Sequence, residues 1–189
     1  MPDSVVHLHK YVMKKHDASR LHYDLRLEWN GVLKSFVVEQ GPSDVADNPR
    51  KALEVEDHDR EYAAFEGVIP KGRYGAGTVM LWDSGMYKPL PEYADVGASL
   101  QNGLLKFILN GEKLKGGWTL KRRDGRLQNE KNLVWDLIKE SDSYARNGCS
   151  GDILEETPNS VAKGRRTLKE IERDWNEPKK KSGATLFDM

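Results

Sequence analysis

Four polar side chains with metal-binding and anion-binding chemistry are spaced so that they could form one site. His22, Asp24 and Arg26 are two residues apart, and His16 lies six residues before His22. Two imidazoles and one carboxylate can hold a divalent cation and leave positions open for water and substrate. A guanidinium beside them could hold an anion against that cation. The residue types therefore suggest a half-open metal site that binds an anionic substrate.

A β-strand would display most of this group on one surface. The stretch 22–28 alternates strictly between polar and apolar residues, beginning with His22. Successive side chains of a strand point to opposite faces, so the polar ones share a face. His16 is expected in a turn that follows a short strand over 11–15. One alternative is that this polar face is simply solvated and that His22 is an ordinary surface histidine.

A further histidine, His58, is expected at the end of another strand. The stretch 51–58 alternates, with Ala52, Glu54, Glu56 and His58 on one side. Side chains at strand ends often reach into a site, so His58 is a candidate site residue. A solvated histidine at the end of a strand is an equally good interpretation.

A glycine-rich segment precedes the strand expected over 78–82. Gly72, Gly75 and Gly77 resemble a phosphate-cradling loop in their spacing. No helical pattern follows them, which disfavours a dinucleotide-binding fold. We expect a tight corner of a barrel instead.

Turn signals separate the remaining strands. Asn30 and Gly31 predict a hairpin between the strand over 22–28 and its neighbour over 33–38. A second hairpin-like pair is expected over 104–109 and 117–122, and a last strand over 134–139. Seven or eight short strands predict a mainly β fold: a small antiparallel β-barrel with a short peripheral helix and flexible termini. A capping box that begins at Thr167 predicts that helix, which should run through Trp175.

The chain is expected to form one domain over residues 11–175. Residues 1–10, with His7 and His9, are expected to be a flexible N-terminal arm. Residues 176–189 are expected to be a flexible basic tail that could touch a nucleic-acid backbone, although many such tails only aid solubility.

Composition limits the classes of function. The 189 residues carry 30 basic and 30 acidic side chains, so a nucleic-acid footprint would have to be local. The single cysteine, Cys149, excludes an intramolecular disulfide and a zinc site built from cysteines. No signal-peptide core and no apolar run of membrane-spanning length is present, so a cytoplasmic protein with no membrane partner is expected.

Motifs spread along the chain resemble those of the DNA 3′-phosphoesterase family, in the same order. This family occurs as a domain of the bacterial multifunctional ligase D and as stand-alone proteins. The motifs are KHDASRLHYDLRLE (15–28), GVLKS (31–35), GPS (41–43), VEDH (55–58), FEGVIP (65–70), YGAG (74–77), WDSG (82–85), GWTL (117–120) and the segment 161–171. The similarity runs from about Tyr11 to about Trp175, and no ligase or polymerase segment follows, so the free-standing form is expected.

The resemblance implies a particular metal site. Family members are similar in having a small β-barrel whose manganese ion is held at the positions of His16, His22 and Asp24. Zn²⁺ is an alternative for the ion bound on purification, because nitrogen-bearing sites hold Zn²⁺ more tightly than Mn²⁺.

The resemblance also implies four catalytic residues. The positions of Arg26 and His58 contact the scissile phosphate, Arg50 is a further contact and Tyr62 a supporting residue. From the sequence, His58 could donate to the phosphate when protonated or act as a general acid.

The implied reaction is the healing of 3′ ends. A 3′-terminal ribonucleoside is removed to leave a 3′-phosphate, which is then removed to leave a 3′-hydroxyl ready for ligation. The implied partners are DNA or DNA/RNA primer-template 3′ ends and an end-joining ligase or polymerase. Two departures from the family pattern, Lys14 in place of glutamine and Gln40 in place of lysine, leave open the balance between the two steps.

Two other classes of protein share some of these features. A two-histidine, one-carboxylate set also describes non-haem iron oxygenases, although their second histidine normally comes from a distant strand. A non-catalytic nucleic-acid-binding β-barrel would explain the basic tail. It would not explain a carboxylate on an anion-binding face, where it would repel phosphate unless a cation intervened.

Overall fold

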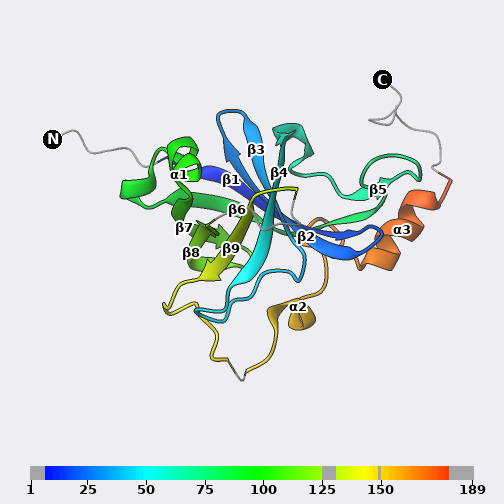
Figure 1. Cartoon of the computed structure of the whole chain (residues 1–189). Coiled ribbons are helices and arrows are strands. Elements are labelled where there is room, and N and C mark those ends of the chain that lie inside the picture. Colours follow the sequence, from blue (N-terminus) through cyan, green and yellow to red (C-terminus); the bar gives the residue numbers. More distant parts are fainter. Residues whose placement is uncertain (1–6, 125–130, 149, 179–189) are drawn as a thin grey trace.

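The fold is a closed antiparallel β-barrel (Figure 1). The computed structural model describes residues 7–124, 131–148 and 150–178. Within them the strands are β1 (His9–Asp17), β2 (Leu21–Trp29), β3 (Val32–Val38), β4 (Arg50–Asp59), β5 (Gly67–Ile69), β6 (Gly77–Pro89), β7 (Leu104–Gly111), β8 (Lys115–Arg122) and β9 (Val134–Lys139). They follow the order β1-β2-β3-β4-β9-β8-β7-β6-β5, and β1 also pairs with β6. This extra pairing closes eight strands into a barrel, as the sequence predicted.

Apolar and polar side chains alternate along the strands, so the apolar side chains of each strand share the face that points into the barrel. Tyr23, Leu25 and Leu27 of β2 are at most 5% exposed and lie in the main core. Three tryptophans fill much of the interior: Trp82, Trp118 and Trp135. Removing a large apolar side chain from water stabilises a fold by about 1.5–3 kcal/mol, so this interior holds the barrel together.

The hairpins form where the turn residues predicted them. Asn30 and Gly31 between β2 and β3 have φ angles of 50° and 82°, the positive values that a two-residue hairpin turn requires. The second predicted hairpin is the β7–β8 pair, in which Phe107 stands opposite Trp118.

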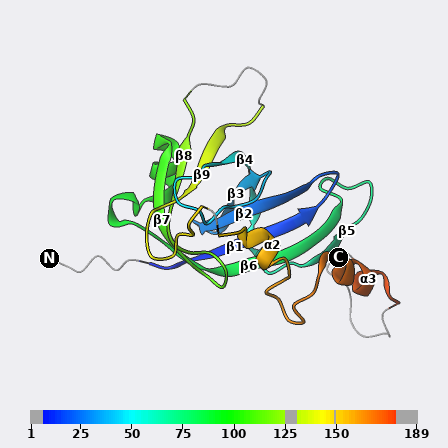
Figure 2. The same ribbon diagram turned by 90° about the horizontal axis from the view of Figure 1, so that it is seen from below.

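The helices lie outside the barrel. They are α1 (Val96–Asn102), α2 (Ile153–Glu156), α3 (Leu168–Asn176) and two 3₁₀ turns, η1 (Arg60–Tyr62) and η2 (Pro91–Tyr93). The predicted N-cap is confirmed, because the Thr167 side chain accepts a hydrogen bond from the Glu170 amide at 3.2 Å, and the Glu170 carboxylate accepts from the Thr167 hydroxyl at 3.2 Å. Figure 2 shows α3 beside β5, at the end of the molecule where the β1–β2 turn lies. A Cβ atom on Gly67 of β5 would lie 2.5 Å from the Trp175 ring, so only glycine fits beneath α3.

Several boundaries differ from those expected. β1 begins at His9, inside the expected arm, because the His9 ring packs against Trp29 and Tyr87 at centroid distances of 5.3 and 5.2 Å. β1 also continues through Asp17, so His16 lies in a strand rather than in the turn. Helices α1 and α2 were not expected from the sequence. Most of the expected arm and tail, and Cys149, lie outside the described residues.

A second, smaller apolar cluster lies on the outer face of the barrel. Val12, Leu33, Ala63 and Leu81 are buried there, with Val161 and Ala162 packed against them. The segments that contribute Ala63 and Val161 therefore cover part of the face that carries the polar side chains of β2. Among the described residues, no helix combines the length and the apolar composition needed to span a bilayer.

Candidate metal centre and phosphate site

The three candidate metal ligands come from the β1–β2 hairpin. His16 stands directly opposite His22, and Asp24 follows His22 by two positions on the same face. Nδ1 of His16 lies 3.5 Å from Oδ2 of Asp24, and Nε2 of His22 lies 3.5 Å from Oδ1. One ligand atom from each residue lies within 4.8 Å of the others. The structure therefore brings together the three residues that the sequence singled out.

Backbone carbonyls determine which ring nitrogen of each histidine faces the carboxylate. Nε2 of His16 donates to the oxygen of Gly75 at 2.7 Å, and Nδ1 of His22 donates to that of Arg20 at 3.0 Å. In a neutral ring, the other nitrogen then presents its lone pair. In both rings this other nitrogen is the one near Asp24. Two lone pairs and a carboxylate repel one another unless positive charge lies between them.

The donor set and its spacing fit a divalent cation. Metal–ligand distances of about 2.0–2.2 Å place neighbouring ligand atoms roughly 3.0–3.6 Å apart, and the two contacts of Asp24 are 3.5 Å long. A histidine ligand usually donates its second ring nitrogen to a carbonyl or carboxylate, as both rings do here. His16 and Asp24 are buried while the His22 side chain is 20% exposed, so the group is open on one side.

Electrostatics keep the carboxylate ionised. Burial opposes ionisation of Asp24, but hydrogen bonds from His16 and His22, together with the charge of Arg26, hold its pKa well below the usual range. The pKa of His22 is raised, chiefly by its hydrogen bond to Asp24. The site is therefore a buried negative charge that attracts a cation, whether a proton or a metal ion.

Arg26 extends the site along the same face. Its Nη2 lies 4.0 Å from Oδ2 of Asp24, and its Nη1 donates to Oγ of Ser35 at 2.8 Å. Ser35 stands opposite Arg26 on β3 and also lies 3.2 Å from Nδ1 of His58. One hydroxyl thus connects the guanidinium and the imidazole for which the family resemblance implies a contact with phosphate.

His58 reaches this face because of a β-bulge. Leu33 stands opposite His58, whereas Ser35 stands opposite Val55, so β4 carries one extra residue between the two pairs. The predicted alternation, which put His58 on the side of Ala52, is therefore wrong at this point. The extra residue turns His58 to the face of Val55 and of the metal ligands.

The His58 ring has one nitrogen available for a substrate. Nδ1 donates to the carbonyl of Glu56 at 2.9 Å and faces Ser35, so Nε2 carries the lone pair of the neutral ring. Burial, and then the charge of Arg26, lowers the pKa of His58. The neutral form therefore predominates at neutral pH, and it can accept a proton at Nε2.

Lys14, one of the two departures from the family pattern, lies beside the candidate ligands. It stands opposite Asp24 on β1, is 2% exposed, and donates from Nζ to the carbonyl of Phe65. Burial, and then the nearby Arg26, lowers the pKa of Lys14 to about 7. A signal existed in the sequence, because Lys14 lies two residues before His16 and so shares its face.

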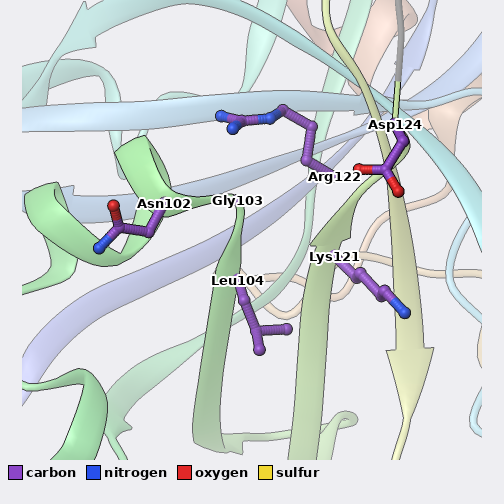
Figure 3. Close-up of a pocket in the computed structure, with 6 residues that line it drawn as sticks. All are labelled: Asn102, Gly103, Leu104, Lys121, Arg122 and Asp124. Atoms are coloured by element: carbon purple, nitrogen blue, oxygen red, sulfur yellow. The ribbon is translucent and has the colours of Figure 1, made fainter.

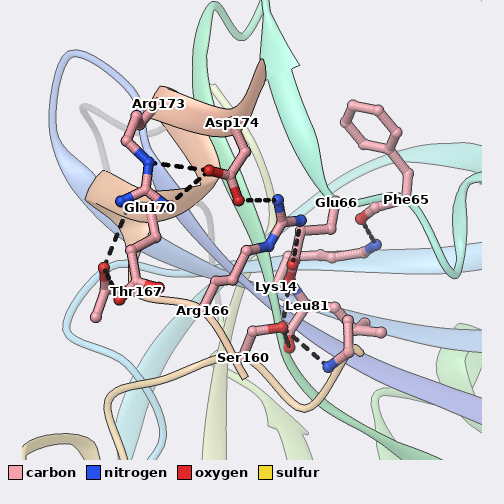
Figure 4. A network of polar contacts seen from close by, with 11 residues as sticks. Lys14, Phe65, Glu66, Leu81, Ser160, Arg166, Thr167, Glu170, Arg173 and Asp174 are labelled. Atoms are coloured by element: carbon pink, nitrogen blue, oxygen red, sulfur yellow. Dashed lines mark hydrogen bonds and ion pairs between the residues drawn. The ribbon is translucent and has the colours of Figure 1, made fainter. Parts of the chain in front are cut away.

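The segment that receives Lys14 is held by a buried carboxylate (Figure 4). Glu66 accepts from the Leu81 amide at 2.8 Å and from Nη2 of Arg166 at 3.0 Å, and it also accepts from the Ser160 hydroxyl. Arg166 donates in turn to Asp174 of α3 at 3.1 Å. The network therefore ties α3 to the outer face of the barrel beside the site.

Arg50 and Tyr62 make contacts with residues other than the three candidate ligands. Arg50 stands opposite the core residue Leu137, and its Nη1 donates to the carbonyl of Gln40 at 3.2 Å. Tyr62 is 41% exposed in η1, and its ring packs against Phe65 at 6.4 Å. Within the described part of the chain, neither side chain has a hydrogen bond, ion pair or ring contact with the three ligands.

A separate cavity of about 230 Å³ lies beside α1 (Figure 3). It is lined by Asn102, Gly103, Leu104, Lys121, Arg122 and Asp124. Nη1 of Arg122 donates to the carbonyls of Leu100 and Gln101 at 3.3 and 3.2 Å. These carbonyls lie in the last turn of α1, where that of Leu100 also accepts from the Gly103 amide, so this arginine helps to cap the helix. We assign the chemistry to the β1–β2 face instead.

The fold and the site define a class of protein: a small antiparallel β-barrel with a candidate metal centre and a neighbouring guanidinium–imidazole pair on its outer face. Residues 14–122 match the family model described as the DNA Ligase D 3′-phosphoesterase domain. The match covers more than half of the chain, and the chain belongs to this family. The family resemblance of the motifs is therefore confirmed.

The chain is also similar to curated proteins named multifunctional non-homologous end joining protein LigD. Identity to the Pseudomonas aeruginosa protein is 47% over 159 residues, covering 84% of this chain and 18% of the relative. Identity to the Mycolicibacterium smegmatis protein is 44% over 134 residues, covering 65% and 17%. The chain spans less than a fifth of the length of these relatives.

Proposed function

We propose that the protein is a metal-dependent phosphoesterase that heals DNA 3′ ends. The observation that carries this proposal is the convergence of His16, His22 and Asp24, whose two 3.5 Å contacts a divalent cation between the ring nitrogens and the carboxylate would satisfy. Membership of a 3′-phosphoesterase family supports the class of reaction. The names of the relatives support a role in non-homologous end joining.

The proposed reaction is two successive hydrolyses. Water first attacks the terminal phosphodiester, and the bond from phosphorus to the 5′ oxygen of a 3′-terminal ribonucleoside breaks. The ribonucleoside leaves with a proton on that oxygen, and the phosphate stays on the shortened strand. Water then attacks this phosphate, the bond from phosphorus to the 3′ oxygen breaks, and a 3′-hydroxyl and inorganic phosphate remain.

The proposed ion is Mn²⁺, held by His16, His22 and Asp24, with Zn²⁺ as the alternative after purification. A bound dication supplies polarisation of a phosphate oxygen and offsets negative charge in the transition state. The carboxylate of Asp24 contributes the anionic ligand, because its lowered pKa keeps it ionised at neutral pH.

Arg26 and His58 are proposed to act on the phosphate itself. The Arg26 side chain is only 14% exposed, so its charge is less screened than that of a surface arginine. His58 can accept a proton at Nε2 and pass it to the leaving oxygen. Arg50 is proposed as a further contact of the phosphate and Tyr62 as a supporting residue, on the basis of the family resemblance.

The loops that border the site, which we call its rim, carry side chains that could bind nucleic acid. Tyr74 is 100% exposed and directly precedes Gly75, whose carbonyl binds His16. Lys71 is exposed on the same loop, and Arg20 is exposed on the β1–β2 turn. A nucleobase stacked on an aromatic side chain gains about 1–3 kcal/mol, and lysine or arginine attracts the phosphate backbone. We propose that primer-template 3′ ends lie across this rim, and that a ligase or polymerase acts on the healed end in the cytoplasm.

One assay tests the proposal against the two alternatives. A labelled duplex with a 3′-terminal ribonucleotide is incubated with the protein, with and without Mn²⁺, alongside His22→Ala. Shortening that needs the metal and His22 supports the phosphoesterase. Binding without cleavage would mean a nucleic-acid-binding module, and iron-dependent oxygen uptake without cleavage would mean an oxygenase.

A further inference from the structure

Ser35 lies at the centre of the anion-binding part of the site. It is 2% exposed on β3, directly opposite Arg26 of β2. Its Oγ lies 2.8 Å from Nη1 of Arg26, 3.2 Å from Nδ1 of His58 and 2.9 Å from the carbonyl oxygen of Leu33. A small buried hydroxyl thus contacts both side chains that are proposed to act on the phosphate.

The direction of these bonds follows from the single proton of the hydroxyl. A serine can donate once and accept twice. The carbonyl of Leu33 can only accept, so Ser35 donates to it. Arg26 can only donate, so Ser35 accepts from it, and the remaining lone pair faces Nδ1–H of His58, which also donates to the Glu56 carbonyl at 2.9 Å. The hydroxyl therefore accepts from the guanidinium and shares the imidazole proton with that carbonyl.

Geometry explains why a residue at this position can hold both groups. Opposed side chains of neighbouring strands are about 4.5–5.5 Å apart at Cβ, which suits Ser35 and Arg26. The bulge in β4 turns His58 to the same face. Without that extra residue, His58 would point to the other side of the sheet, away from Ser35.

We propose that Ser35 is a positioning residue that orients Arg26 and His58 toward one phosphate. This role rests on the proposed phosphoesterase function. Arg26 is long and flexible, and its other guanidinium nitrogen, Nη2, lies 4.0 Å from Asp24. The bond to Ser35 gives the guanidinium a second fixed point, so the side chain loses less entropy when the phosphate binds. Ser35 itself keeps its contacts with Arg26, His58 and Leu33 when the phosphate binds.

The test replaces Ser35 in the full chain and measures more than turnover. In Ser35→Ala we expect kcat, and the affinity of the Mn²⁺-loaded protein for inorganic phosphate, each to fall by about 10–100-fold, as expected for charge-assisted bonds. The affinity for Mn²⁺ should change by less than about twofold, because the three ligands are untouched. Ser35→Thr keeps the hydroxyl and should stay within about threefold of wild type.

A matched control separates positioning from a loss of packing. Ser99 of α1 is also buried, at 8% exposed, and donates to the carbonyl of Tyr93 at 3.3 Å. Ser99→Ala removes a buried hydroxyl without touching the site, so phosphate affinity and kcat should stay at wild-type values. Thermal unfolding of both alanine variants verifies that they fold.

A double-mutant cycle shows whether Ser35 acts through Arg26. In an Arg26→Ala background, Ser35→Ala should change phosphate affinity much less than in wild type, because only the contact with His58 remains to be lost. Undiminished phosphate affinity in Ser35→Ala alone, or an effect of the same size with and without Arg26, would overturn the proposal. If wild type fails to cleave 3′ ends, the proposed function fails, whereas the phosphate-binding cycle still tests the role of Ser35.

Discussion

The carbonyl oxygen of Gly75 lies 2.7 Å from Nε2 of His16, across a sequence separation of 59 residues. This contact selects the ring nitrogen that His16 presents to Asp24, so a loop residue controls the chemistry of a strand residue. Gly75 has a φ angle of +75°, which a residue with a side chain adopts only with strain. The Gly75 peptide therefore has a backbone conformation that favours glycine, and its carbonyl also binds a candidate metal ligand.

Gly75→Ala should weaken metal binding more than Gly72→Ala does. Moving the carbonyl removes the partner of His16, and loss of such an outer partner typically costs about 10–100-fold in metal affinity. Gly72→Ala is the matched control, since Gly72 has a φ angle of +88° in the same loop and no atom within 4 Å of its added Cβ. Titration with Mn²⁺, followed by electron paramagnetic resonance, measures both. Equal losses in the two variants would show that only loop strain matters.

His22→Ala and Arg26→Ala should separate metal binding from turnover. His22 is a proposed ligand, so its loss should reduce metal content and activity together. Arg26 lies beside the ligands and binds Ser35, so Arg26→Ala should keep the metal while turnover falls by about 100-fold or more. Metal analysis of the purified variants, alongside the cleavage assay, gives the comparison. Loss of metal in Arg26→Ala would mean that its role has been misassigned.

Metal affinity should fall as the pH is lowered. The hydrogen bond to Asp24 raises the pKa of His22 above 6.5 in the metal-free protein, so protons begin to compete for Nε2 at a higher pH than for an ordinary histidine. A metal ion must displace that proton, so the apparent affinity should decline about tenfold per pH unit for each proton displaced. Mn²⁺ titrations between pH 8 and pH 5.5 measure this slope. An affinity that stays constant over this range would contradict the proposed ligand.

Glu66→Ala should destabilise the protein and loosen α3. The change leaves the Leu81 amide without its acceptor and removes the partner of Nη2 of Arg166. An unsatisfied buried group costs about 1–3 kcal/mol of unfolding free energy. Arg173→Ala is the control, because the Arg173 side chain is 61% exposed and its ion pair is screened by solvent, so its loss should have little effect on stability. Denaturant unfolding and hydrogen exchange in α3 report the two effects. Equal stability of both variants would show that the carboxylate is dispensable.

Tyr74→Ala should weaken binding to primer-template ends and leave metal binding intact. If a base stacks on the exposed ring, its loss should raise the dissociation constant of the duplex by about 5–150-fold. Tyr144→Ala is a suitable control, since Tyr144 is 57% exposed but comes from the segment after β9. Fluorescence anisotropy of a labelled duplex compares the variants. Tyr74→Phe should bind like wild type, and a loss in that variant would point to the hydroxyl instead of the ring.

The ligand group could be predicted from the sequence because its geometry is local. His22, Asp24 and Arg26 lie on one strand, where a period of two fixes their common face. His16 joins them through an antiparallel hairpin, although the sequence put it in the turn and the structure puts it in β1. Hairpin pairing over so short a distance leaves few alternative registers.

The rest of the site depends on contacts that a local pattern does not contain. The bulge that redirects His58 arises from the pairing of β3 with β4. The carbonyl of Phe65 meets Lys14 only after residues 60–76 fold back over the barrel. Because strand periodicity says nothing about such distant pairings, these contacts, like the role of Ser35, emerge only from the folded chain.

All three candidate ligands lie within residues 16–24, on two strands joined by a tight turn. A loop this short closes in well under a microsecond, long before the distant ends of a barrel can meet. We therefore expect a bound ion to favour this hairpin early in refolding. The hairpin that carries the candidate ligands would then form before the rest of the barrel. Refolding of the chain should therefore accelerate when the ion is supplied at the start.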